Sequence, residues 1–496
     1  MAVPERSMQG VAGRVSDTGG LRRKVSTSSS CQSQAPQTIQ EQLRNRNGYL
    51  PIDAYGIIGN LRTVALVGLD GGLDFMCWPN FDSPSVFCRL LDKHIGGHFS
   101  IVPSMPGTSK QQYLPNSNVL TTKFLSEEGV AQITDLMYRS DPKAKSPRIF
   151  LPWVIRYVEV VRGTVEFDIE CFPAFDYARA RHTTDIVKER RLDRLSSHVP
   201  LGRALTQHSN LECLFPTYKH PQRVIFTSYS RTECRSGDEA DKPEMVMDLN
   251  TVVGGSENGC PEFTWEVVER PGMKGPGVVT HFTLQEGERV AFVLRDIDTE
   301  EIMYEDARRK NRSAYSSKPS SSTVSATAST PYQYTGGTSG ATCPQPPLPG
   351  ANASEGHTDS NDNESIPDYN CNVLNINPAI TMDFVEDLID DTVLYWHNWI
   401  RACKYDGRWR EAVERSALTL KLLTFEPTGA VVAAPTFSLP EHFGGSRNWD
   451  YRYVWIRDSA FTIYALMRLG LTQEAEKYME FIDHLFQNKA SSKRYR

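Results

Sequence analysis

The sequence of 496 residues contains no long hydrophobic run, and its mean hydropathy is −0.43. A membrane-spanning helix needs about 20 consecutive apolar residues, so we expect no membrane span and no membrane partner. Met1 to Arg6 lack the apolar segment of a secretory signal, which leads us to expect a cytoplasmic protein. The net charge of −6 is small and unpatterned, which argues against a nucleic-acid partner.

Metal-binding cysteine patterns are also missing. None of the ten cysteines forms a Cys-x-x-Cys pair, and no His-rich segment provides the spacing of metal ligands. Without a secretory route, reduced thiols fit better than a disulfide framework. We therefore expect neither a metal nor a cofactor.

The first part of the chain changes from polar to strand-like composition near residue 49. Residues 1–48 are rich in Ser, Gln and Arg, which predicts a disordered tail. Residues 49–305 contain repeated extended stretches separated by Gly-rich turns, which predicts an antiparallel β-sandwich. The expected hairpins join residues 63–69 to 73–78, 119–125 to 130–137, and 153–161 to 164–171.

The second part begins after a segment rich in Ser, Thr and Pro at 313–368, which we expect to be a disordered insert. From 380 to 496 the apolar residues recur at helical spacing. Helices are expected at about 381–400, 409–424, 458–469 and 472–487. The second should turn Val413, Ala417, Leu420 and Leu423 inward. Strands followed by helices predict two separate layers or domains.

The densest motif lies between the second and third expected helices. Residues 447–458 contain four aromatic side chains, two acids and three arginines. Aromatic faces pack on the apolar faces of pyranose rings, and Arg with Asp can bracket neighbouring hydroxyls. A structural alternative is equally open on composition alone: Arg447 would pair with Asp450, Asp458 would cap a helix, and the tryptophans would fill a core.

Three segments resemble one enzyme family. The stretch Asn-Trp-Asp-Tyr-Arg-Tyr-Val-Trp-Ile-Arg-Asp at 448–458 is similar to glycoside hydrolase family 15, the glucoamylase-like and trehalase-like enzymes. The preceding 429–441 resembles the same family. Residues 55–60, with Asp70-Gly71 and Pro79 to Pro84, resemble the trehalase-like N-terminal domain that accompanies such catalytic domains.

The resemblance implies a β-sandwich followed by an α/α toroid, and hydrolysis of an α-glucosidic bond in starch-type oligosaccharides or trehalose with inversion. It assigns Arg457 and Asp458 to the non-reducing glucose, and it places Tyr451 and Trp455 in the same subsite. Inversion uses a general acid and a general base about 6.5–9.5 Å apart. In the family both are glutamates located well beyond the Arg-Asp pair.

Only 38 residues follow Asp458, whereas a toroid of twelve helices needs roughly 200 residues. We therefore expect the first helices of an incomplete toroid at 380–496, and a C-terminally shortened chain. No catalytic residue is assigned within it, because the acid and base are expected beyond the C-terminus. We therefore expect this chain alone to catalyse little or no hydrolysis. One alternative is a non-catalytic carbohydrate-binding or regulatory protein; another is a product whose C-terminal end does not fold stably.

Overall fold

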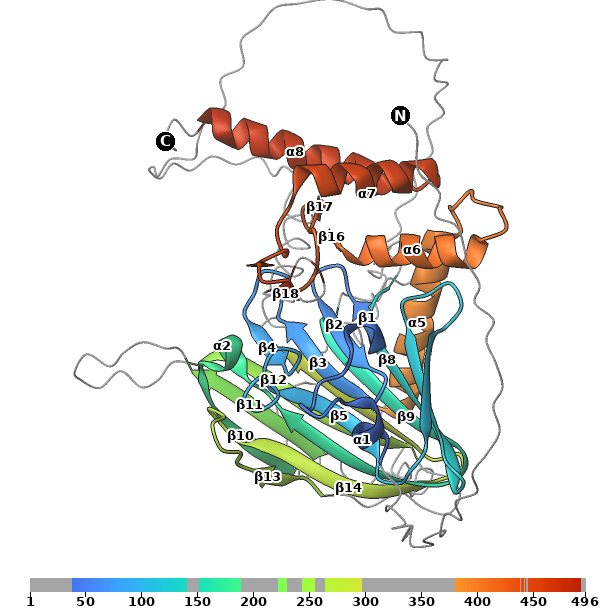
Figure 1. Ribbon diagram of the computed structural model, residues 1–496, viewed down its shortest axis with the longest axis vertical. Helices are drawn as coiled ribbons and strands as arrows, with labels where there is room; N and C mark the ends of the chain where they lie inside the picture. The colour runs from blue at the N-terminus through green and yellow to red at the C-terminus, as the bar shows by residue number, and fades with distance from the viewer. Residues whose placement is uncertain are drawn as a thin grey trace, which may run out of the picture. The chain divides into compact units, whose positions relative to one another are not determined.

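A computed structural model describes residues 38–140, 151–188, 222–229, 243–254, 264–296, 380–437, 439–440, 442 and 445–491 (Figure 1). The expected insert at 313–368 and residues 1–37 of the expected tail lie outside the described residues. After two short helical segments, the described chain forms mainly strands up to residue 296 and mainly helices from residue 382, as the sequence predicts. No helix among these residues is both long and apolar enough to cross a membrane.

The strands form two antiparallel sheets. The first contains β1 (Tyr55–Gly59), β2 (Val64–Gly68), β3 (Gly72–Cys77), β4 (Ser85–Cys88), β5 (His98–Pro103), β13 (Glu266–Val268) and β14 (Gly277–Gln285). The second contains β6 (Thr108–Tyr113), β7 (Leu120–Leu125), β8 (Gly129–Met137), β10 (Arg181–Lys188), β11 (Gln222–Tyr229), β12 (Pro243–Gly254) and β15 (Arg289–Asp296). One strand, β9 (Trp153–Phe172), belongs to both.

The expected hairpin at 153–171 is wrong, because β9 is a single strand of 20 residues. Gly163 has a φ of 74°, which only glycine adopts easily, and the chain continues past it instead of reversing. The half before Gly163 pairs with β8 and β15, and the half after it pairs with β5 and β14. The strand therefore bends from one sheet into the other. The other two expected hairpins are confirmed as β2–β3 and β7–β8.

The two sheets pack face to face, which confirms the sandwich. The ring of Phe292 on β15 lies 6.2 Å from Phe99 on β5 and 6.4 Å from Phe282 on β14. The buried Arg156 of β9 crosses the same space, donating 2.7 Å to Asp135 on β8 and 2.8 Å to the carbonyl of Gly71. Apolar contacts thus form the core, and one buried ion pair is embedded in it.

The expected tail ends earlier than residue 48. Thr38 caps a short helix, α1 (Ile39–Leu43), and Glu41 returns the hydrogen bond in a capping box. The buried side chain of Ile39 joins the sandwich core, and Arg44 binds two aspartates of the β-domain. Residues 38–48 are therefore part of the folded β-domain. Further short helical turns are the 3₁₀ helix Ile52–Ala54 and α2 (Phe175–Ala178).

Four longer helices follow: α5 (Met382–Ile400), α6 (Arg410–Leu422), α7 (Ile456–Arg468) and α8 (Gln473–Ser491). Short strand pairs lie among them, β16 (Thr424–Phe425) with β17 (Ala430–Val431) and β18 (Leu439–Pro440) with β19 (Asn448–Trp449). All four helices agree with the expected ranges to within a few residues. Their relation to an α/α toroid stays a prediction.

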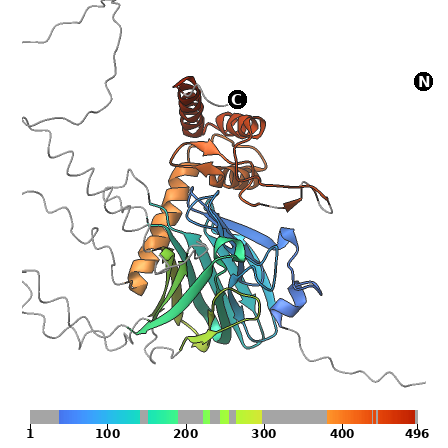
Figure 2. The same cartoon turned by 90° about the vertical axis from the view of Figure 1, so that its left-hand side faces the viewer.

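Helix α5, the orange helix beside the strands in Figure 2, packs its buried Val385 and Leu388 against Trp153 and Val293 of the second sheet. The inward face of α6 differs from expectation. Glu414 and Lys421 are buried there, because each has an ionic partner: Arg410 for Glu414 and Glu474 of α8 for Lys421. Hydrophobic spacing does not reveal paired charges of this kind.

A bidentate ion pair also joins the helices to the sandwich. Arg139, which follows β8, donates to both carboxylate oxygens of Glu426 at 2.7 and 2.6 Å. Asn118 adds a hydrogen bond of 3.2 Å to the carbonyl of Leu418 in α6. These contacts hold the loop after β16 and one helix directly on the β-domain.

Candidate functional site

The predicted sugar motif forms the loop before α7. Its backbone is fixed along one side, because the amides of Ala433 and Ala434 donate to the carbonyls of Tyr453 and Tyr451 at 3.0 and 2.9 Å. Val454 forms a bridge with Val432 next to these bonds. The loop is therefore an ordered extension of the segment after β17.

Arg457 and Asp458 lie in the first turn of α7, as expected. Their side chains are 73% and 42% exposed, and Arg457 Nη2 lies 3.5 Å from Asp458 Oδ2. Oδ2 is buried and accepts no hydrogen bond from any residue that the structure describes. The positive end of the helix favours a carboxylate at this position. A buried acceptor beside a guanidinium fork can take a hydroxyl donor from a ligand.

The two aromatic residues of the predicted subsite lie together. The rings of Tyr451 and Trp455 are stacked, with centroids 5.8 Å apart and planes inclined by 26°. Trp455 is 40% exposed, and its neighbours Trp449 and Tyr453 are 45% and 57% exposed. The structural alternative, in which the tryptophans fill a core, is therefore wrong for Trp449 and Trp455, which present aromatic surface outward.

Asp450 pairs with Arg452, not with Arg447 as the structural alternative supposed. Arg452 donates from Nε and Nη2 to the two oxygens of Asp450 at 2.9 and 2.8 Å. Burial alone would raise the pKa of Asp450, but the hydrogen bonds and charge of Arg452 outweigh it and lower that pKa. Asp450 is thus a fixed anion committed to Arg452.

Sequence reasoning gave Arg452 no role of its own, and it did not connect Arg452 with Phe81, Ser83 or Tyr177. Its guanidinium reaches the β-domain, where Nη1 donates to the carbonyls of Phe81 and Ser83 and Nη2 donates to the hydroxyl of Tyr177. Nη1 also lies 3.4 Å from the sulfur of Cys77. Burial raises the pKa of that thiol to about 12, so it stays neutral. These partners lie more than 270 residues away, where no sequence spacing could point to them.

Two pockets among the described residues lie away from this loop. One of about 680 Å³ opens over the first sheet, beside Asp168, Glu170 and His281. The other, of about 500 Å³, lies between the loop at 426–429 and Lys477 of α8. Neither is lined by Tyr451, Trp455, Arg457 or Asp458.

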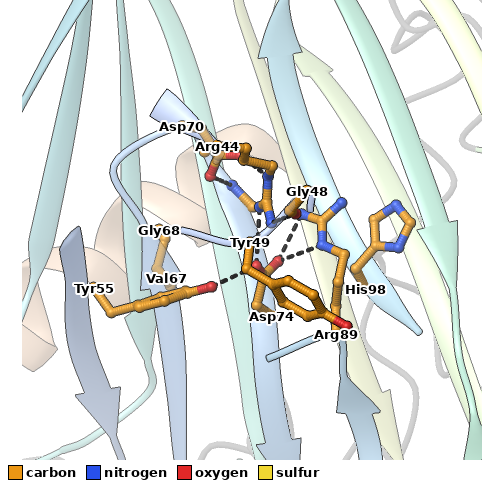
Figure 3. Close-up of polar contacts among 12 residues, drawn as sticks. Arg44, Gly48, Tyr49, Tyr55, Val67, Gly68, Asp70, Asp74, Arg89 and His98 are labelled. Atoms are coloured by element: carbon orange, nitrogen blue, oxygen red, sulfur yellow. Dashed lines mark hydrogen bonds and ion pairs between the residues drawn. The ribbon is translucent and has the colours of Figure 1, made fainter. Parts of the chain in front are cut away.

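A dense buried charge cluster lies on the β-domain, around Asp74 (Figure 3). Arg44, Arg89 and the hydroxyl of Tyr55 all donate to Asp74, at 2.9, 2.8 and 2.8 Å. Arg44 also donates 2.7 Å to Asp70. Because these charges are committed to one another, the cluster holds residues 44–49 on the sheet and offers no free group for catalysis.

The cluster makes the free energy of unfolding depend on pH in the acid range. Burial raises the pKa of Asp74, but the charges of Arg89 and Arg44, with hydrogen bonds from Arg89 and Tyr55, lower it to about 2. A lowered folded-state pKa contributes stability that is present above about pH 4 and lost as pH falls towards 2. We expect Asp74→Asn to destabilise the protein at pH 7 and to do so progressively less below pH 4, measured by urea unfolding.

The exposed carboxylate of Glu127 offers a control, because Glu127→Gln should leave the unfolding free energy unchanged across the same range. An Asp74→Asn penalty that is equal at pH 7 and pH 2.5 would contradict the assignment of the charge to this cluster.

No group of three or more His, Cys, Asp or Glu residues within the described ranges could hold a metal ion. The cysteines that the structure describes, Cys77, Cys88, Cys171 and Cys403, are all free thiols.

Comparison with known proteins finds similarity to two family models, one in each part of the chain. Residues 407–493 match the model of glycosyl hydrolases family 15, and residues 45–199 match the trehalase-like N-terminal model. The helices and the aromatic loop fall in the first match, and the opening strands of the sandwich fall in the second. The C-terminal part of the chain is thus similar to glycosyl hydrolases family 15, and its N-terminal part is similar to the trehalase-like N-terminal domain.

The curated relatives that it matches are trehalases. The chain is 26% identical over 475 residues to the trehalase of Mycobacterium tuberculosis, covering 92% of this chain and 49% of the relative. It is 27% identical to that of Mycolicibacterium smegmatis and 26% identical to that of Thermoplasma volcanium, covering 88% and 87% of this chain and 48% and 47% of the relatives. The chain thus spans about half the length of these relatives.

Proposed function

We propose that this chain forms the glucose-binding side of an inverting α-glucosidase that acts on trehalose or a related α-glucoside. The observation that carries the proposal is the geometry at the start of α7. A stacked aromatic pair, Tyr451 and Trp455, precedes an exposed Arg457 and an Asp458 whose buried Oδ2 lies 3.5 Å from Arg457 Nη2 and accepts no hydrogen bond from the described residues.

Each group has a distinct task in this proposal. The aromatic faces pack against the apolar face of the pyranose ring. Arg457 donates to ring hydroxyls, and Asp458 accepts from them, so the two together orient the non-reducing glucose. Orientation of this kind presents the glycosidic oxygen to an acid and the anomeric carbon to a water.

The acid and the base belong to polypeptide outside residues 1–496 in this proposal. Asp450, the nearest other carboxylate in the loop, is committed to Arg452 and ionised, so it suits neither a general acid nor a water-activating base.

The test is a pair of measurements on the purified 496-residue chain. We expect it to bind trehalose or maltose, measured by calorimetry, and to release little or no glucose from either. Glucose release that Asp458→Ala abolishes would overturn the assignment of acid and base to other polypeptide. Absence of binding to any α-glucoside would overturn the proposed subsite. Binding without turnover also fits a non-catalytic carbohydrate-binding protein, which the exposed tryptophans favour.

A further inference from the structure

Arg452 is the point at which the aromatic loop meets the β-domain. It is only 6% exposed, and every arm of its guanidinium is in use. It binds Asp450 in its own loop, the carbonyls of Phe81 and Ser83 after β3, and the hydroxyl of Tyr177 at 3.0 Å. A rigid planar fork of this kind fixes position and orientation together.

The Tyr177 side of this contact is built on a strained backbone. Asp176, Tyr177 and Ala178 have φ values of 47°, 57° and 61°, a left-handed run that residues with a Cβ rarely adopt. Strain of this kind persists only where surrounding contacts determine it, and it gathers at functional positions. Here Arg179 donates to the carbonyl and the carboxylate of Asp176 at 2.9 and 2.6 Å, which ties the turn.

The turn directs Tyr177 towards the second part of the chain. The ring of Tyr177 meets Phe437 edge to face, with centroids 5.1 Å apart, and Arg452 lies over the same phenylalanine at 4.7 Å. Three residues from two parts of the chain thus form one contact: Tyr177 of the β-domain, and Phe437 and Arg452 from the helical part. The two residues flanking Arg452, Tyr451 and Tyr453, are held on the other side by the amides of 433–434.

We propose that Arg452 is a positioning residue for the glucose subsite, and that Tyr177 of the β-domain sets the affinity of that subsite through it. Arg452 touches no sugar. It holds the backbone of 450–453 between the β-domain and the 433–434 segment, and this fixes the stacked Tyr451 and Trp455. The part of this inference that concerns sugar affinity rests on the proposed function. The part that concerns the position of the loop does not depend on it.

The principal variant is Tyr177→Phe, which removes the hydroxyl that accepts from Arg452 and keeps the ring on Phe437. The matched control is Tyr229→Phe, which removes a tyrosine hydroxyl bonded to Thr183 on the far strands β10 and β11. A second variant, Arg452→Lys, keeps the charge but cannot serve Asp450, Ser83 and Tyr177 at once.

Hydrogen exchange in the full chain, without any sugar, measures how firmly the loop is held. We expect the amides of 448–455 to exchange about tenfold faster in Tyr177→Phe than in wild type or Tyr229→Phe, since a bond to a charged group is lost. Arg452→Lys should increase exchange further. Equal rates in Tyr177→Phe and wild type would overturn the proposal.

A sugar titration measures the affinity of the subsite. The dissociation constant for trehalose or maltose should rise about 3- to 10-fold in Tyr177→Phe, with no rise in Tyr229→Phe and equal melting temperatures in both. Unchanged affinity despite faster exchange would overturn the link between Tyr177 and the subsite. If the wild-type chain binds no sugar, the proposed function fails, and the exchange data still decide whether Arg452 and Tyr177 position the loop.

Discussion

Asp458→Ala is expected to weaken the binding of trehalose or maltose at least about tenfold, because a hydrogen bond to a charged group contributes roughly 1.5–3 kcal/mol. Asp458 Oδ2 is buried and accepts no hydrogen bond from the described residues, although Arg457 Nη2 lies 3.5 Å away, so a sugar hydroxyl would be its hydrogen-bond partner. Calorimetric titration of the 496-residue chain measures the change directly.

Asp458 also lies in the first turn of α7, where a carboxylate contributes about 0.3–1 kcal/mol to helix stability. A melting curve therefore accompanies the titration, to separate a small loss of stability from a loss of binding. Asp483→Ala, which removes an exposed carboxylate from α8, is the matched control. Equal sugar affinity in Asp458→Ala and wild type would remove Asp458 from the subsite.

Arg156→Met should be the most destabilising single change in the sandwich, costing about 3–5 kcal/mol in the free energy of unfolding. Arg156 and Asp135 have fully buried side chains, and Arg156 also donates to the carbonyls of Gly71, in the turn before β3, and of Phe99 on β5. Methionine fills much of the volume but leaves Asp135 as an unpaired buried charge. Urea unfolding at pH 7 measures the loss.

The double variant Asp135→Leu with Arg156→Met separates charge from volume. Replacing a whole buried ion pair with apolar residues is often neutral, whereas breaking it is costly. We therefore expect the double variant to recover much of the stability that Arg156→Met loses. A double variant as unstable as the single one would show that the bonds to the carbonyls of Gly71 and Phe99 matter more than the charge on Asp135.

Sequence patterns predicted the order of strands and helices because apolar periodicity is a local property. The same reasoning failed at Gly163, where an Arg-Gly pair looks like a turn but forms a bend inside one strand. Whether a glycine reverses a strand or bends it depends on distant partners, here β14 and β15. The short helix before Arg44 did carry a readable signal, since Thr38 and Glu41 have the spacing of a capping box.

The candidate site also has a part that the sequence predicted and a part that it did not. Family resemblance pointed to Tyr451, Trp455, Arg457 and Asp458, and the structure brings the first two together and places the last two side by side at the start of α7. Their sugar-binding roles stay predictions. Arg452 stood in the same motif, but its importance comes from Tyr177 and Ser83. Contacts between residues so far apart in the chain arise from tertiary packing, which spacing within a motif does not encode.

The long strand shared by the two sheets has a consequence for folding during synthesis on the ribosome. β9 is complete at Phe172, but its partners β14 and β15 begin only at Gly277 and Arg289. At about 5–20 residues per second, a ribosome needs roughly 5 to 20 seconds to supply β14. During that interval one edge of β9 lacks its neighbours, and an unpaired strand edge invites pairing with other chains. Until β14 and β15 are made, the growing polypeptide therefore carries β9 without these partners, and this unpaired edge is a point of exposure to aggregation.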